Sequence, residues 1–317
     1  MGFRLAVLAF LLSACTGSIT APVVDPDGGP NDPDGGGPGA PDASPVDPTE
    51  VEAVCNRWNS DRVDLSEGAW TGDVATCNAG TYEAPGPTNT LKLINLYRWL
   101  SGLPATSIDA GQSAQAQECA LMMRANGMLS HNPPATWDCY TAAGATGASR
   151  SNISTAPSVR SVDAYMADNF APTSLGHRRW ILSGGLSSVG VGSTNAHSCL
   201  YVINGFGGGG GGWTAFPGPG VFPHEAVAPF IYSIDEAGWS IQSDSINLGG
   251  AVVTITADGI EVPVVVNQLG SGFGSCYAIA MVPQGWETQA DTTYHVSVTG
   301  IATAIDYDVH VVDCDAL

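Results

Sequence analysis

The chain has 317 residues, of which 44% are hydrophobic and only 13% are charged, and its formal net charge is −20 at pH 7. Ten Lys and Arg residues against 30 Asp and Glu leave too few cations for phosphate binding, so nucleic acid is excluded as an expected partner. No apolar run reaches the roughly 18–20 residues that a membrane-spanning helix needs. Length and apolar content allow one large domain or two ordinary ones.

Residues 1–14 have the pattern of a bacterial lipoprotein signal peptide. Arg4 supplies the positive start, and the apolar stretch from Leu5 to Leu12 is too short to span a bilayer. The segment Leu12-Ser13-Ala14-Cys15 resembles the lipobox, in which the cysteine is lipidated and the signal is cut just before it. Cys15 is therefore the expected lipidation site, and several acyl chains on one residue give stable membrane attachment. The alternative is a plain secretory signal with an incidental cysteine.

Residues 15–50 combine this cysteine with a tract of Asp, Pro and Gly that buries too little apolar surface to fold. We expect a disordered spacer there, and after it a lead-in at 51–84 pinned by a disulfide. In an exported protein the remaining cysteines are expected to pair, although spacing does not fix their connectivity. The preferred pairs are those near in sequence: Cys55–Cys77, Cys119–Cys139 and Cys276–Cys314, with Cys199 left over. The sequence contains no C-x-x-C motif, so a thiolate zinc site is not expected.

Helical periodicity follows in three places. Asn89-Thr90 is a candidate cap for a helix whose apolar face recurs at helical spacing: Leu93, Leu96, Tyr97 and Leu100. A second helix over about 111–126 buries Ala116, Ala120 and Met123 and ends at Gly127. A third over about 159–169 presents Val162, Tyr165, Met166 and Asn169 or Phe170.

After His177 the pattern changes to strands. Two strands are expected at 188–192 and 200–203, before a glycine loop at 207–212. Beyond about 222, alternating apolar residues at 294–298 and 307–311 and a hairpin turn at Asp258-Gly259 predict an all-β region. We therefore expect an α+β chain with a mixed domain at 85–216 and a small immunoglobulin-like β-sandwich at 217–317.

A family pattern runs through residues 89–204. Its fragments are, in chain order, Asn95-Leu96-Tyr97-Arg98 with Gly102-Leu103-Pro104, then Ala116, Ala120 and Met123, then Leu129-Ser130-His131, Ser151-Asn152-Ile153, Gly176-His177-Arg178-Arg179-Trp180-Ile181-Leu182 and Val189-Gly190-Val191-Gly192. Together they resemble the CAP superfamily (cysteine-rich secretory proteins, antigen 5 and pathogenesis-related 1), particularly its bacterial branch. The resemblance implies an α-β-α sandwich for this domain, with two histidines facing one open cleft.

In many relatives that cleft holds two His and two Glu, sometimes around a divalent metal. Carried over by motif, the histidines are His131 and His177, and Asp168 stands where the second Glu is usual. Ser151 replaces the first Glu and cannot serve as a general base. The expected cleft residues are His131, Ser151, Asn152, Asp168, His177 and Arg178. The two histidines and Asp168 leave zinc binding with an open coordination position plausible, although no cofactor is required.

Two functions follow from this site. The first is a binding module for a lipid-like, sterol-like or envelope-polymer ligand, or a metal, held outside the cytoplasm by the lipid anchor, at the outer membrane or cell surface. The second is a metal-assisted hydrolase or peptidase using His131, His177 and Asp168. Structural alternatives stay open, since His177 can orient a loop, His131 can pin a turn, and Asp168 can pair with His177 or Arg178. The sequence leaves the oligomeric state open.

Overall fold

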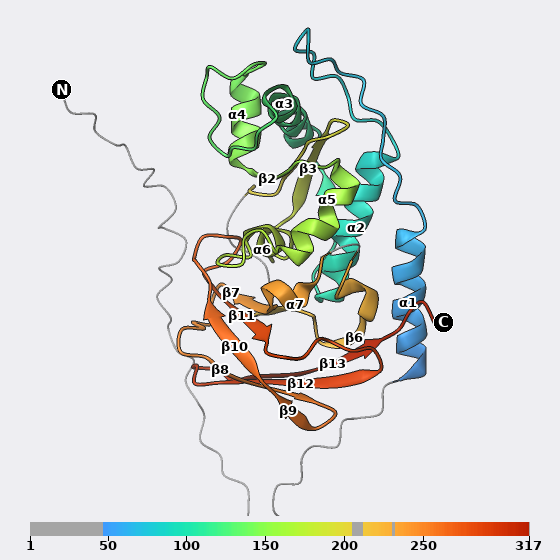
Figure 1. Cartoon of the computed structure of the whole chain (residues 1–317), viewed down its shortest axis with the longest axis vertical. Helices are drawn as coiled ribbons and strands as arrows, with labels where there is room; N and C mark the ends of the chain where they lie inside the picture. Colours follow the sequence, from blue (N-terminus) through green and yellow to red (C-terminus); the bar gives the residue numbers. More distant parts are fainter. Residues whose placement is uncertain (1–46, 205–211, 230–231, 317) are drawn as a thin grey trace, which may run out of the picture.

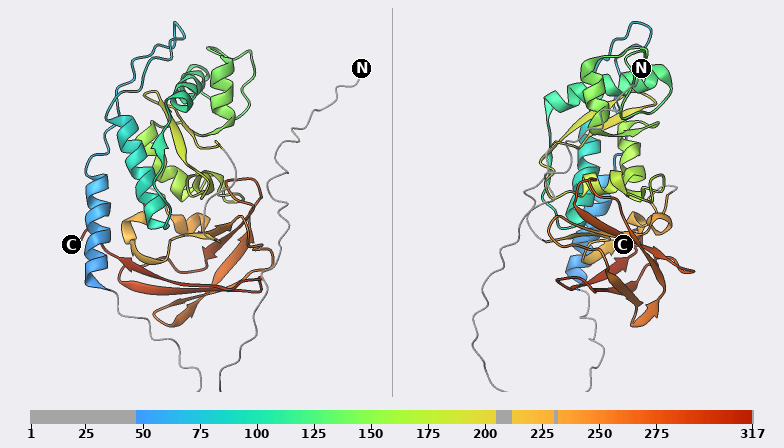
Figure 2. Two further views of the ribbon diagram at one scale, coloured as in Figure 1. Left: turned by 180° about the vertical axis from the view of Figure 1, so that it is seen from behind. Right: turned by 90° about the vertical axis from the view of Figure 1, so that its left-hand side faces the viewer.

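The computed structural model describes residues 47–204, 212–229 and 232–316. They form an α+β molecule in which helices and one sheet make up one end and two further sheets the other (Figure 1). The views from behind and from the side show the same division (Figure 2). The predicted signal peptide, Cys15 and most of the spacer lie outside the described residues, as does most of the glycine loop. No helix within the described ranges is long and apolar enough to cross a membrane.

The N-terminal part is the expected α-β-α sandwich. Its sheet has the order β1-β3-β4-β2, with β1 at Ser107–Ile108, β2 at Ser151–Ser154, β3 at Ser188–Ser193 and β4 at Ser198–Tyr201. Side chains alternate along β3 because successive residues of a strand face opposite sides. Val189 and Val191 join the core formed with α2 and α5, whereas Gly190 and Gly192 face α3. A Cβ on Gly192 would lie 2.1 Å from the Ala116 carbonyl carbon, so α3 packs directly on the backbone of the strand.

The three predicted helices are present as α2 (Gly86–Leu100), α3 (Ala110–Asn126) and α5 (Ser158–Ala167). The residues predicted for the inner faces of α2 and α3 are buried, and Gly127 ends α3 in the left-handed region at φ 61°. The capping prediction at Asn89-Thr90 is wrong, because both residues lie inside α2 after its start at Gly86. The third helix ends at Ala167, two residues earlier than predicted, and Phe170 beyond it is 70% exposed.

The predicted lead-in begins with a helix that was not predicted, although Val51, Val54, Cys55 and Trp58 recur at helical spacing. Helix α1 spans Pro48–Arg62, so it also takes the last residues of the predicted spacer. Its final residue, Arg62, donates two hydrogen bonds to the Asp163 carboxylate on α5, at 2.9 and 2.8 Å. Further along, the Glu67 carboxylate accepts the backbone N–H groups of Val159 and Arg160 in the first turn of α5. The lead-in therefore caps and braces α5, satisfying amides that a helix start leaves open.

The predicted cysteine pairs are all wrong. Three disulfides join described cysteines, Cys55–Cys314, Cys77–Cys139 and Cys119–Cys199, over 259, 62 and 80 residues. No cysteine within the described ranges is free. Nearness in sequence failed as a guide because each bond joins different elements. Cys119–Cys199 ties α3 to the sheet, Cys77–Cys139 ties the lead-in to the loop before α4 (Ala142–Ser149), and Cys55–Cys314 ties α1 to the C-terminus.

The C-terminal part is a β-sandwich of two sheets. One sheet has the order β10-β11-β7-β5, formed by Val264–Gln268, Tyr277–Pro283, Trp239–Ser243 and Thr214–Phe216. The other has the order β6-β13-β12-β8-β9, formed by Gly220–Pro223, Ile305–Val312, Thr292–Thr299, Val252–Ala257 and Ile260–Val262. A short 3₁₀ turn, η1 (His224–Ala226), and helix α7 (Ile234–Ala237) precede β7. The β-sandwich is thus present, and its immunoglobulin-like character stays a prediction.

The predicted hairpin at Asp258-Gly259 is confirmed. Strands β8 and β9 pair in antiparallel register across it. Asp258 and Gly259 have φ values of 47° and 82°, as a two-residue turn matched to strand twist requires. The alternation predicted for β12 and β13 is also confirmed, since the apolar residues of both strands are buried: Tyr294, Val296, Val298, Ile305, Tyr307, Val309 and Val311.

One hydrophobic core runs through both parts of the molecule. It contains Leu93 of α2 and Val162 of α5 together with Phe216 of β5 and Val309 of β13. Strand β5 was expected in the first domain, yet it pairs with β7 of the sandwich. The Tyr97 and Phe216 rings meet edge to face across the junction, with centroids 5.9 Å apart. The two parts therefore pack as one body, and chain order alone did not show this.

Candidate functional site

Asp168 orients other residues of the candidate site through its hydrogen bonds. It follows α5 in the left-handed region, at φ 53° and ψ 31°, a conformation that Asp adopts more readily than most residues. Its side chain is fully buried. Oδ2 accepts the backbone N–H of His177 at 2.9 Å and that of Arg178 at 3.3 Å, while Oδ1 accepts Nδ1 of His177 at 2.7 Å. The carboxylate thus holds both the start of α6 (Gly176–Ile181) and the imidazole ring.

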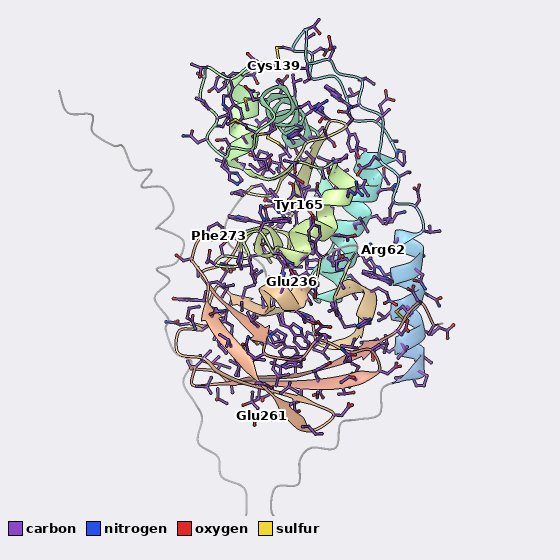
Figure 3. All side chains as sticks on the ribbon, in the orientation of Figure 1. Arg62, Cys139, Tyr165, Glu236, Glu261 and Phe273 are labelled. Atoms are coloured by element: carbon purple, nitrogen blue, oxygen red, sulfur yellow. A yellow bond between two sulfur atoms is a disulfide. The ribbon has the colours of Figure 1, made fainter. Side chains whose placement is uncertain are left out.

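The His177 ring is held on its face as well as at its edge. It stacks on Tyr165 of α5, with centroids 5.2 Å apart and an interplanar angle of 23°. Tyr165 lies near the middle of the molecule, between the first sheet and the sandwich (Figure 3). The His177 side chain is 24% exposed. Because a carboxylate only accepts, Nδ1 carries a proton, and in the neutral form of the ring Nε2 keeps a lone pair for an outside group.

His131 is also held through its Nδ1 atom, in this case by a backbone carbonyl. Its Nδ1 lies 3.0 Å from the backbone oxygen of Ala148, the second-to-last residue of α4. A carbonyl oxygen accepts only, so Nδ1 is again the protonated nitrogen and Nε2 the free acceptor. The residue is exposed to solvent. Both histidines therefore offer Nε2 as an acceptor.

Strand β2 follows α4, whose Ala148 orients His131, and it contacts the segment of His177. It begins three residues after Ala148, and the Asn152 side chain donates to the backbone oxygen of His177 at 3.0 Å. The Ser151 hydroxyl is buried and has no hydrogen-bond partner among the described residues. The structure thus shows how Asp168 and Asn152 support His177, while Ser151 brings no carboxylate to the site.

Comparison with known families fits this arrangement. Residues 91–204 match the family described as the cysteine-rich secretory protein family, CAP. These residues therefore form a domain of the CAP superfamily. A search of curated proteins and a search of solved structures each gave no significant match. CAP membership and the disulfides indicate an extracellular protein, and a CAP domain suggests a binding or signalling module.

Arg178 does not belong to the open face of the CAP domain. Its guanidinium is buried and donates to the backbone oxygens of Met166, Ala167 and Gly238 at 2.6, 2.9 and 2.7 Å, and to the Ser240 hydroxyl at 3.2 Å. Burial lowers the pKa of Arg178 to about 10, an effect partly opposed by nearby carboxylates. The expectation that Arg178 lines the ligand cleft is therefore wrong. It joins the CAP domain to the sandwich instead.

No group of three or more His, Cys, Asp or Glu side chains within the described ranges is arranged to hold a metal ion. The chemistry of Asp168 agrees with this, because its two oxygens already accept three hydrogen bonds inside the protein. Zinc at His131 and His177 stays a prediction. It would have to take its remaining ligands from solvent or substrate.

Two functional contacts were missed from the sequence. The stacking of Tyr165 on His177 had a local signal, because Tyr165 stands three residues before Asp168, near the end of α5. The Ala148 carbonyl that orients His131 had none, because any residue presents the same backbone oxygen. Arg179, next to Arg178, is buried as well, and its guanidinium donates to the backbone oxygens of Gly270 and Ser275 in the sandwich.

Proposed function

We propose that the CAP domain is an extracytoplasmic binding module that takes a hydroxyl-bearing ligand, lipid-like or polymeric, at His131 and His177. The observation that carries this proposal is the commitment of both Nδ1 atoms to protein acceptors, at 3.0 Å for His131 and 2.7 Å for His177. Each ring then presents Nε2 as an acceptor for a donor hydroxyl. The preorientation lowers the entropy lost on binding, because neither ring has to select a tautomer or rotamer.

Exposed apolar side chains beside these histidines favour a lipid-like ligand. Met128 and Leu129, just before His131, are 55% and 40% exposed, and Phe170, two residues after Asp168, is 70% exposed. A ligand with an apolar body and one hydroxyl would satisfy both features.

The second candidate is the metal-assisted hydrolase. The Asp168–His177 pair favours the hydrolase, because a carboxylate that accepts a hydrogen bond from an imidazole orients the ring and makes it a stronger base and a better metal ligand. Against it stand the buried position of Asp168 and the serine at position 151, which leave no free carboxylate to activate water. Binding is therefore the better-supported function.

Calorimetry with cholesterol and cholesteryl acetate in matched micelles tests the binding proposal. We expect the sterol to bind and its acetate, which has no hydroxyl donor, to bind at least about ten-fold more weakly, the value of one to two hydrogen bonds. His131→Ala/His177→Ala should remove this preference. The matched control is His295→Ala, a histidine of the sandwich bonded to Asp308. Equal affinity for both sterols would contradict the proposal.

The same samples separate binding from metal chemistry. If native mass spectrometry finds zinc that is retained by the parent chain and lost in His177→Ala, the hydrolase becomes the better reading. Nitrogen-15 NMR of the imidazoles supplies a direct check of the geometry. Both His131 and His177 should show the tautomer protonated at Nδ1, and an Nε2-protonated signal for either ring would refute the orientation argued here.

We also propose that Cys15 anchors the protein to a bacterial membrane, at the outer membrane or cell surface. The support is the lipobox pattern Leu12-Ser13-Ala14-Cys15. Cys15→Ala should move the protein from the membrane fraction to the soluble one. Mass analysis of the parent chain adds a sharper test, because a thioether-linked lipid and a disulfide cannot share one sulfur. A Cys15–Cys276 disulfide would exclude the anchor.

A further inference from the structure

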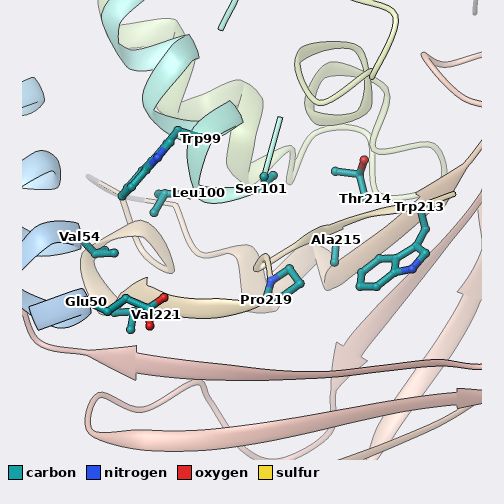
Figure 4. A pocket seen from close by; sticks show the side chains of 11 residues that line it. Glu50, Val54, Trp99, Leu100, Ser101, Trp213, Thr214, Ala215, Pro219 and Val221 are labelled. Atoms are coloured by element: carbon teal, nitrogen blue, oxygen red, sulfur yellow. The ribbon is translucent and has the colours of Figure 1, made fainter. Parts of the chain in front are cut away.

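A groove away from the histidine site lies where the CAP domain meets the sandwich. It has a volume of about 450 Å³ and is walled by the start of α1, the end of α2, and strands β5 and β6 (Figure 4). Its lining residues come from all four elements: Glu50, Val54, Trp99, Leu100, Ser101, Gly102, Trp213, Thr214, Ala215, Pro219 and Val221. This volume lies within the range of small-molecule sites.

Two tryptophans stand at opposite ends of the groove in Figure 4. Both are half-buried, and each is held by a neighbour outside the lining. The Arg57 guanidinium lies 4.5 Å from the ring centroid of Trp99, and the Tyr307 ring lies 5.2 Å from that of Trp213. The indoles are therefore held as rigid platforms, which can contact a ligand at little entropic cost.

The groove carries negative charge at two places. Glu50 is its one ionisable lining residue, and its carboxylate lies at the start of β6, where a Cβ on Gly220 would be 3.3 Å from Oε1. The C-terminal end of α2, at Leu100 and Ser101, adds the negative end of a helix dipole.

Ser101 supplies an observation of a different kind. The residue is 7% exposed and lines the groove, yet its hydroxyl is buried with no hydrogen-bond partner among the described residues. An unpaired buried hydroxyl costs roughly 1–3 kcal/mol, so a ligand that pairs with it gains affinity. This orphan hydroxyl points to an occupant with hydrogen-bonding groups of its own.

We propose that this groove binds a neutral saccharide, with a pyranose ring packed against Trp213. The flat C–H face of a pyranose suits an indole surface, and its hydroxyls can donate to the Glu50 carboxylate and exchange a hydrogen bond with Ser101. An anion is disfavoured by Glu50 and the helix dipole. A cation would be repelled by Arg57, whose guanidinium already lies over the Trp99 ring. A lipid would leave Glu50 and Ser101 without hydrogen-bond partners. The inference is independent of the histidine site.

Calorimetry on the full chain with neutral trisaccharides of glucose, mannose and N-acetylglucosamine tests the proposal. At least one should bind. Trp213→Ala should raise its Kd at least about ten-fold, and Glu50→Gln and Ser101→Ala about three- to ten-fold each, as expected for a lost aromatic contact and for single hydrogen bonds. Glu50 is exposed, so the Glu50→Gln chain should fold as the parent does.

Trp137→Leu is the matched control, a half-buried tryptophan that packs against a separate core cluster around α3. It should leave the Kd unchanged. The proposal is overturned if none of the sugars binds at millimolar concentration, or if binding survives Trp213→Ala and Glu50→Gln together. Choline serves as the cationic probe. Choline binding that is lost in Glu50→Gln, with no sugar bound, would reassign the groove to a cation and also overturn the proposal.

Discussion

Replacing Arg178 with methionine tests whether the CAP domain and the sandwich form one cooperative unit. The guanidinium makes four hydrogen bonds, two to the end of α5 and two to the residues around the start of β7. Arg178→Met keeps the apolar stem and removes every donor. The backbone oxygens of Met166, Ala167 and Gly238 then lose their cationic partner in the interior.

Two opposing terms set the size of the effect. Hydrogen bonds from a charged donor contribute about 1.5–3 kcal/mol each, so the four together are worth several kcal/mol. Against this, keeping the cation buried is unfavourable, and the pKa lowered to about 10 corresponds to about 3 kcal/mol. We expect Arg178→Met to lower the free energy of unfolding by about 3 kcal/mol.

Urea unfolding under oxidising conditions measures this loss, followed by circular dichroism and by tryptophan fluorescence. The parent chain should unfold in one transition by both probes, because its core is continuous. Arg178→Lys should fail to restore stability, since one ammonium cannot reach all four acceptors. Arg124→Met, at an exposed arginine of α3, is the control. A loss below about 0.5 kcal/mol in Arg178→Met, the range of ordinary surface substitutions, would refute the role given to this side chain.

Three further outcomes are expected. Replacing Cys55 and Cys314 with serine should lower the free energy of unfolding by about 3–5 kcal/mol, because this bond closes a 259-residue loop; an unchanged urea midpoint would contradict that. Gly192→Ala should cost at least about 2 kcal/mol, since its Cβ would lie 2.1 Å from the backbone of α3, whereas Gly111→Ala, 3.3 Å from a side chain, should be nearly neutral. Burial and the Arg124 charge lower the pKa of His197, so the folded state resists its protonation. Stability from this group is present above its unfolded pKa of about 6.5 and declines as pH falls below it. Urea titrations between pH 7.5 and 5 should show a shallower decline in His197→Phe, and equal slopes would reject the assignment.

Much of the secondary structure in both parts of the molecule could be predicted because its signals are local. The inner face of α2, the end of α3 at Gly127 and the turn at Asp258-Gly259 depend on residues within one or two turns of each other. The close packing of α3 on β3 left a sequence trace as well, since only glycine at positions 190 and 192 permits it. Helix α1 was missed although its apolar residues Val51, Val54, Cys55 and Trp58 do recur at helical spacing.

At the candidate site, the sequence motifs identified the residues but not the contacts around them. His131, Asp168 and His177 were identified from the sequence. The tertiary structure showed that the Asp168 carboxylate accepts three hydrogen bonds from backbone and ring N–H groups of the segment after it. It also showed that Arg178 does not line the cleft. The sequence could not show this, because an Arg-Arg pair looks the same whether its guanidiniums contact water or donate to buried backbone oxygens.

The sequence by itself determined the charge, the family and the change from helices to strands along the chain, since these follow from composition, motifs and short-range periodicity. Only the tertiary structure decided the cysteine pairing, the shared core and the groove between α1 and β5. The physical reason is that a contact between residues far apart in the chain depends on where whole elements pack. Cys55 and Cys314 meet only because α1 lies beside β6 next to the C-terminal strand, and no local spacing encodes that.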